Sequence, residues 1–124
     1  MVVAAEIARK LHAPLDLIVV RKVGHPDKPE YAVCVVTDNK QILCDEDEKA
    51  YIDRQTLQQL IAKERAEARR RREVYLKGRN PLPCRGKTAI LVDDGVATGL
   101  TILAALKVVQ EQQPKAVIVA LPVV

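Results

Sequence analysis

Runs of consecutive apolar residues, separated by amphipathic and charged segments, set the pattern of this chain. Two of these runs, 17–20 and 117–121, are apolar at every position and do not alternate with polar residues. Strands that are covered on both faces have this character, which is typical of a parallel sheet between helices. We therefore expect an α/β fold, with a mainly parallel sheet flanked by helices and a hairpin-plus-long-helix insertion.

The N-terminal half is expected to form a helix, a buried strand and a hairpin. The spacing of apolar residues predicts a helix over 2–11, and the first apolar run predicts a strand over 15–20. Two β-prone runs, 31–36 and 41–44, are separated by the turn-forming residues 37–40, as in a β-hairpin.

The C-terminal half is expected to form a long charged helix and a βαβ unit. Asp53 or Thr56 stands where a residue can cap a helix that runs to about Leu76. An exposed connector with two prolines follows. The strand, crossover helix and second strand of the βαβ unit are expected at 88–92, 99–110 and 116–121.

Composition narrows the class of protein. Hydrophobic residues make up 48% of the sequence but aromatic residues only 2%, so the core is expected to be aliphatic. The net charge of +4 favours anionic ligands such as phosphates without choosing among them. No apolar stretch is long enough to cross a bilayer and no signal-like segment follows Met1, so we expect a soluble, cytoplasmic protein.

The three cysteines, Cys34, Cys44 and Cys84, lack the C-x-x-C spacing of a zinc site. Cys34 and Cys44 stand where they could face each other across the expected hairpin. Because an odd and sparse set of cysteines does not make a disulfide framework, we expect buried free thiols.

The loop after the strand at 88–92 contains acidic, glycine and threonine residues in an order that is typical of a ligand-binding site. Its residues are, in order, Asp93, Asp94, Gly95, Val96, Ala97, Thr98, Gly99, Leu100 and Thr101. Glycines let a backbone approach a ligand closely, and the free amides at a helix N-terminus hold phosphate, to which threonine hydroxyls add hydrogen bonds. Two adjacent carboxylates would repel a phosphate unless a hydroxyl-bearing group such as a sugar lay between them.

Other phosphate-handling motifs fit this segment less well. Gly86-Lys87-Thr88 is similar to the end of a P-loop, but Pro81 stands where the first glycine is needed and a strand follows instead of a helix. A haloacid-dehalogenase-like phosphatase needs two aspartates separated by one residue. A response-regulator receiver needs its acidic pair near the start of the domain. An acidic turn without a ligand is the purely structural alternative.

The run from Ala89 to Thr101 resembles the signature of the type I phosphoribosyltransferase family: four apolar residues, two acids and a Gly/Ala-Thr-Gly loop. The resemblance implies that Asp93 and Asp94 are the catalytic residues and hold the ribose 2′ and 3′ hydroxyls of phosphoribosyl pyrophosphate (PRPP). It places the 5′-phosphate in the loop from Gly95 to Thr101. It also implies that Arg21 and Lys22, directly after a buried strand, meet the pyrophosphate.

The implied reaction is transfer of the phosphoribosyl group from PRPP to a nitrogenous base, a pentosyl transfer with release of pyrophosphate. Mg²⁺ is the implied cofactor, bound through PRPP, with Asp93 or Asp94 as candidate ligands. Ala97 stands where members acting on 6-oxopurines carry an acid, which argues against hypoxanthine or guanine and leaves the base unidentified. One domain is expected over 1–124, with a hood and insertion region at 24–87 and the βαβ unit at 88–124.

Family members usually place a strand and an Arg-Gly-Gly loop ahead of a helix like 2–11, and continue beyond a strand like 116–121. We therefore expect a fragment, a sequence with a misassigned start or a degenerate copy of the domain, whose open sheet edge could pair in a homodimer. Two alternatives to an enzyme stay open. One is a regulatory module that senses PRPP or a nucleotide without turnover. The other is an RNA-binding protein that uses Arg69–Arg72, which is disfavoured because no aromatic platform accompanies the arginines.

Overall fold

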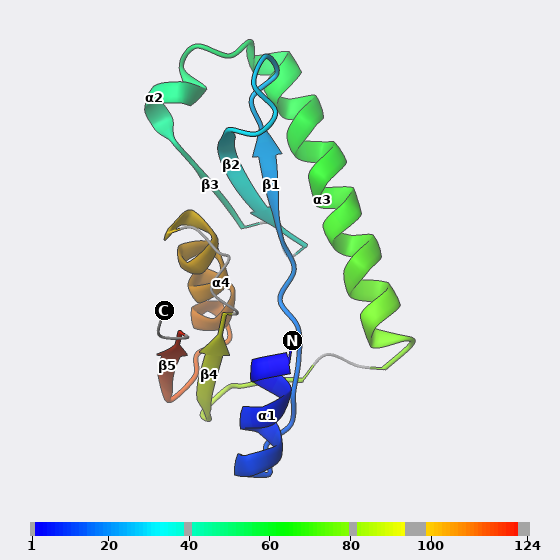
Figure 1. Cartoon of the computed structure of the whole chain (residues 1–124), viewed down its shortest axis with the longest axis vertical. Helices are drawn as coiled ribbons and strands as arrows, with labels where there is room; N and C mark the ends of the chain where they lie inside the picture. Colours follow the sequence, from blue (N-terminus) through cyan, green and yellow to red (C-terminus); the bar gives the residue numbers. More distant parts are fainter. Residues whose placement is uncertain (1, 39–40, 80–81, 94–98, 122–124) are drawn as a thin grey trace.

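The computed structural model describes residues 2–38, 41–79, 82–93 and 99–121. Within these residues four helices and five strands follow one another along the chain (Figure 1). Their bounds are α1 Val2–Leu11, β1 Val20–Gly24, β2 Ala32–Thr37, β3 Ile42–Cys44, α2 Glu46–Lys49, α3 Arg54–Leu76, β4 Thr88–Val92, α4 Gly99–Glu111 and β5 Ala116–Ala120.

The strands form two sheets. β1, β2 and β3 make an antiparallel sheet in that order, and β4 pairs with β5 in parallel. The connections between the first three strands are short and join antiparallel neighbours, whereas the crossover through α4 allows β4 and β5 to run in parallel. The α/β class, the hairpin and the βαβ unit are thus confirmed. Among the described residues, parallel pairing is confined to the C-terminal unit.

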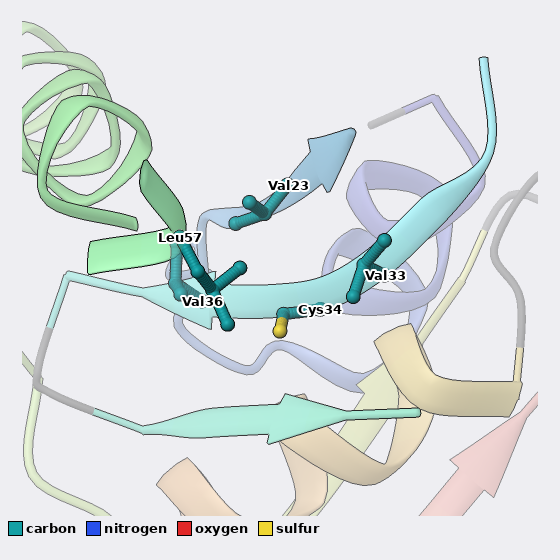
Figure 2. Close-up of a cluster of buried hydrophobic side chains, with 5 residues drawn as sticks. All are labelled: Val23, Val33, Cys34, Val36 and Leu57. Atoms are coloured by element: carbon teal, nitrogen blue, oxygen red, sulfur yellow. The ribbon is translucent and has the colours of Figure 1, made fainter. Parts of the chain in front are cut away.

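The core lies on both faces of the three-stranded sheet. Residues 33–37 of β2 are completely buried, so side chains that alternate between the two faces are all covered. On one face, Leu57 of α3 packs with Val23, Cys34 and Val36 (Figure 2). On the other face lies α4, which contacts all three strands and buries alanine and valine residues. The core is aliphatic, as the composition predicts.

The long helix α3 begins and ends close to its predicted bounds. Asp53 caps its N-terminus by accepting a hydrogen bond from the Thr56 N–H at 3.0 Å. The helix ends where Lys77 adopts a left-handed conformation with φ of 50°. Although α3 spans 23 residues, it is highly charged, and no helix in the described part of the chain is long and apolar enough to cross a membrane.

The first strand is displaced from its predicted position. The apolar run predicts a strand over 15–20, whereas β1 begins at Val20. Its ladder starts opposite Thr37, the last residue of β2, and the described strands offer the preceding residues no partner. Instead, the Tyr75 hydroxyl donates a hydrogen bond to the Leu15 carbonyl oxygen at 3.4 Å. Apolar sequence alone misplaces this strand because a strand ends where its hydrogen-bonding neighbour ends.

Cys34 and Cys44 form a disulfide between β2 and β3. The expectation of free thiols is therefore wrong for this pair, and it holds for Cys84, which is free and half-buried. The two bonded residues are direct partners in the β2–β3 ladder. Their position across the expected hairpin allows the bond, but the odd number of cysteines argues against it; the register of the two strands decides, because it brings the two sulfurs together.

Gly24 closes β1 at a point where another part of the backbone comes very near. A Cβ atom on Gly24 would lie 2.4 Å from the carbonyl oxygen of Pro29. We expect Gly24→Ala to lower the free energy of unfolding by about 1–3 kcal/mol, because the backbone must shift to relieve this overlap. Urea unfolding measures the change. Gly99→Ala is the matched control, since a Cβ there meets nothing within 4 Å. Equal stabilities of the two variants would contradict the steric explanation.

Candidate functional site

Asp93 lies at the carboxyl end of β4, directly after Val92. Its backbone N–H donates a hydrogen bond to the Ala120 carbonyl oxygen at 3.3 Å, which extends the pairing of β4 with β5 beyond the strand end. Asp93 is half-buried, and none of the described residues hydrogen-bonds its carboxylate. The backbone of Asp93 is thus fixed by β5, and its carboxylate, which has no hydrogen-bond partner in the described part of the chain, lies at the strand end where α/β proteins bind ligands.

A helix N-terminus follows this strand end after a short connection, because α4 begins at Gly99. The predicted site residues of that connection lie outside the described residues; they are Asp94, Gly95, Val96, Ala97 and Thr98. Gly99 is exposed and has open space where a Cβ would stand, and Thr101 lies half-buried in the first turn. The first N–H groups of a helix have no acceptor within the helix, so this end of α4 favours an anion.

Arg21 and Lys22 lie inside β1 rather than after a strand, so their side chains point to opposite faces of the sheet. Arg21 lies on the face covered by α3, where its Nε donates a hydrogen bond to Glu64 Oε2 at 2.9 Å. The side chains of Arg21 and Glu64 are mostly buried, with 29% and 19% of their surface exposed. The expectation that the two residues follow a strand is therefore wrong, and their proposed contact with the pyrophosphate stays a prediction.

Lys22 lies on the opposite face of the sheet, the face that α4 covers, and it is exposed. Its ladder partner in β2 is Val35. Of the two basic residues, Lys22 therefore shares a side of the sheet with the helix that follows Asp93. Two adjacent basic residues look equivalent in a sequence. In a strand, their side chains point to opposite faces of the sheet, so they cannot be treated as one pair.

Comparison with known proteins identifies the domain. Residues 1–123 match the family described as phosphoribosyl transferase domain. The chain belongs to this family. The resemblance that the sequence motif suggests is thereby confirmed, and it extends over almost the whole chain.

Similar phosphoribosyl transferase domains occur in longer proteins. Two proteins of Mycobacterium tuberculosis, from strain CDC 1551 / Oshkosh and strain ATCC 25618 / H37Rv, carry the name "Putative phosphoribosyl transferase". Each is 37% identical over 123 residues, which cover 98% of this chain and 28% of the relative. The crystal structure of TT1426 from Thermus thermophilus is similar with a TM-score of 0.71 and 40% identity, over 98% of this chain and 58% of that one. The chain thus spans only part of the length of each.

The arginine block of α3 is largely engaged with carboxylates of this phosphoribosyl transferase domain. Glu67 accepts hydrogen bonds of 2.6 to 3.0 Å from Arg70 and Arg71, and these bonds lower the pKa of Glu67 to about 2. The pair with Arg71 has the four-residue spacing that is typical of helical ion pairs. Arg72 binds Asp16. Three of the four arginines thus have acidic partners in their own chain, which leaves them less available to a nucleic acid.

Glu64, the ion-pair partner of Arg21, was missed by the sequence analysis of this phosphoribosyl transferase domain. It lies on α3 at helical spacing from Leu57, Ile61 and Ala68, which face the sheet. An acid on an otherwise apolar stripe signals a cationic partner on the facing element, because an unpaired carboxylate is costly to bury. This signal could have identified Glu64, although not Arg21 as its partner.

Proposed function

We propose that this domain binds PRPP and transfers its phosphoribosyl group to a nitrogenous base, with release of pyrophosphate. The proposal is carried by the position of Asp93 at the carboxyl end of a parallel strand, one short connection ahead of the α4 N-terminus. There a carboxylate can accept hydrogen bonds from ribose hydroxyls while the helix end holds the 5′-phosphate. Family membership supports the same assignment.

The chemistry requires cleavage of the bond between C1 of the ribose and pyrophosphate, with positive charge developing on the sugar ring. Asp93 and Asp94 would hold the 2′ and 3′ hydroxyls, and their negative charge would favour the oxocarbenium-like transition state. The amides of residues 95–99 and the Thr101 hydroxyl would fix the phosphate. Most of the rate enhancement would come from positioning and electrostatics.

Mg²⁺ would bind at the end of β4 together with PRPP. The described residues contain no group of three or more His, Cys, Asp or Glu that could hold a metal ion. Mg²⁺ commonly binds through one or two carboxylates together with substrate phosphates and waters, and the Asp93 carboxylate is a donor of the required kind. The ion would neutralise charge on the leaving pyrophosphate.

The variants Lys22→Gln and Arg21→Gln should show which of the two basic residues contributes to PRPP binding. We expect Lys22→Gln to weaken PRPP binding about tenfold to a hundredfold, the loss of one charge-assisted hydrogen bond. Affinity for ribose 5-phosphate should stay unchanged, because that ligand lacks the pyrophosphate. Arg21→Gln should change PRPP affinity by less than about threefold, since Glu64 holds Arg21 on the other face. Calorimetric titration measures each affinity. Equal losses in both variants would contradict the preference for Lys22.

Calorimetric titration of the purified chain with PRPP, with and without Mg²⁺, tests the proposed function. We expect saturable binding that depends on Mg²⁺ and weakens strongly in the Asp93→Asn/Asp94→Asn variant. Pyrophosphate release in the presence of a panel of bases then distinguishes a transferase from a module that senses PRPP without turnover. A folded chain that binds neither PRPP nor ribose 5-phosphate would overturn the proposal.

A further inference from the structure

The disulfide between Cys34 and Cys44 joins a central strand to a short edge strand. β2 is fully buried over residues 33–37 and is paired on both sides, whereas β3 has three residues and, among the described strands, pairs only with β2. The two cysteines are direct ladder partners, and Figure 2 shows the sulfur of Cys34 directed from β2 toward β3. The covalent bond therefore secures a short strand at the edge of its sheet.

The two cysteine residues differ in their exposure to solvent. Cys34 is completely buried within the core cluster formed with Val23, Val36 and Leu57. Cys44 is half-buried and packs against that cluster from the edge of the sheet. The disulfide therefore lies closer to solvent on its Cys44 side, and a thiol reductant would approach it from that side.

β3 also forms part of the surface on which α4 rests. α4 contacts β3 as well as β1 and β2. Just before β3, the Gln41 side chain hydrogen-bonds Glu111, the last residue of α4. The position of β3 is thus coupled to that of α4, and any loosening of β3 withdraws support from this helix.

We propose that the Cys34–Cys44 disulfide is a redox-reversible clamp that fixes β3 on β2. In the reducing step, a thiolate of a dithiol reductant attacks Sγ of Cys44 and the disulfide breaks. The electron pair passes to Sγ of Cys34, which takes up a proton. The second thiol of the reductant then attacks the mixed disulfide and releases Cys44 as a thiol. The protein gains two electrons and two protons, and the dithiol becomes a disulfide. The clamp is independent of the identity of the ligand.

Thiol counting and hydrogen exchange test the clamp on the whole chain. The protein is equilibrated with mixtures of reduced and oxidised dithiothreitol, quenched with acid, alkylated under denaturing conditions and analysed by mass spectrometry. We expect a reversible transition between one alkylated thiol, at Cys84, and all three. In the reduced form, the amides of β3 should exchange at least about tenfold faster, while those at the centre of β2 change little. Cys84→Ser is the matched control and should show the same reversible transition and the same change in exchange, with no alkylated thiol in the oxidised form and two in the reduced form.

The order of access is tested separately with single variants. Under native conditions, Cys44 in Cys34→Ala should react with glutathione disulfide about tenfold faster than Cys34 does in Cys44→Ala. The exchange comparison uses the wild-type chain, so it stands even if Cys34→Ala fails to fold. The proposal is overturned if the folded, oxidised chain keeps three free thiols, if β3 exchanges at the same rate in both forms, or if Cys34 is the more reactive sulfur.

Discussion

Arg72→Met should lower the free energy of unfolding by about 2–3 kcal/mol, the loss expected when one partner of a mostly buried ion pair is removed. The Arg72 guanidinium donates two hydrogen bonds to Asp16, of 2.8 and 3.0 Å, and its side chain is only 15% exposed. Asp38 lies 3.8 Å from its Nε. Asp16 also accepts the N–H of Leu82 at 3.4 Å. The pair therefore joins α3 to three connecting segments, and methionine keeps the apolar stem of Arg72 but leaves Asp16 without its cation.

Urea unfolding of both proteins at neutral pH measures this loss, and Arg70→Met is the matched control. Arg70 is 62% exposed and pairs with Glu67 of its own helix, so its replacement should leave stability nearly unchanged. Comparable destabilisation by the two substitutions would mean that the long-range pair contributes no more than a surface pair.

The acid limb of the stability curve gives a second readout of the same pair. Burial raises the pKa of Asp16, but the hydrogen bond and charge of Arg72, with the N–H groups of Leu17 and Leu82, outweigh it and hold that pKa below its ordinary value of 3.8. A carboxyl whose pKa is lowered by folding contributes stability above the unfolded pKa and loses it as the pH falls through the folded one. The difference between wild type and Arg72→Met should therefore narrow below about pH 3.8.

The C-terminal unit is predictable because its signals are local. A short apolar run bounded by polar residues predicts β4 with the observed bounds, and the apolar periodicity that begins at Gly99 predicts α4. The same reasoning places α1 over Val2–Leu11 and limits the cap of α3 to Asp53 or Thr56, of which Asp53 is the cap. In each case, the residues that specify the element lie within it or beside it.

The N-terminal sheet is less predictable because its geometry depends on partners that are distant in the sequence. β1 starts where β2 offers a partner, and this start puts Arg21 and Lys22 on opposite faces. Arg21 meets Glu64, which lies 43 residues away. The Cys34–Cys44 bond likewise follows from the register of two strands. The sequence shows which residues are charged or can form a disulfide. It does not show the strand pairing that determines which residues are in contact.

The Asp93→Asn/Asp94→Asn variant should show the largest functional effect, a fall in turnover of at least about a thousandfold. Asparagine keeps the size of aspartate and one carbonyl acceptor, but it removes the negative charges proposed to face the developing positive charge at C1. The fold should survive the change. The Asp93 bond to Ala120 uses the backbone N–H, and no described residue hydrogen-bonds the Asp93 carboxylate.

Two measurements on the same preparations, pyrophosphate release and PRPP titration, distinguish transition-state stabilisation from ribose binding by these carboxylates. Asp47→Asn, on the exposed acidic face of α2, is the control. A fall in kcat much larger than the loss of PRPP affinity would mean that the charges act mainly in the transition state. Equal losses of affinity and kcat/KM would mean that the carboxylates mainly hold the ribose hydroxyls, because a contact that is equally strong in the bound substrate and the transition state changes both by the same factor. Wild-type turnover by the folded double variant would place the reacting sugar away from the end of β4.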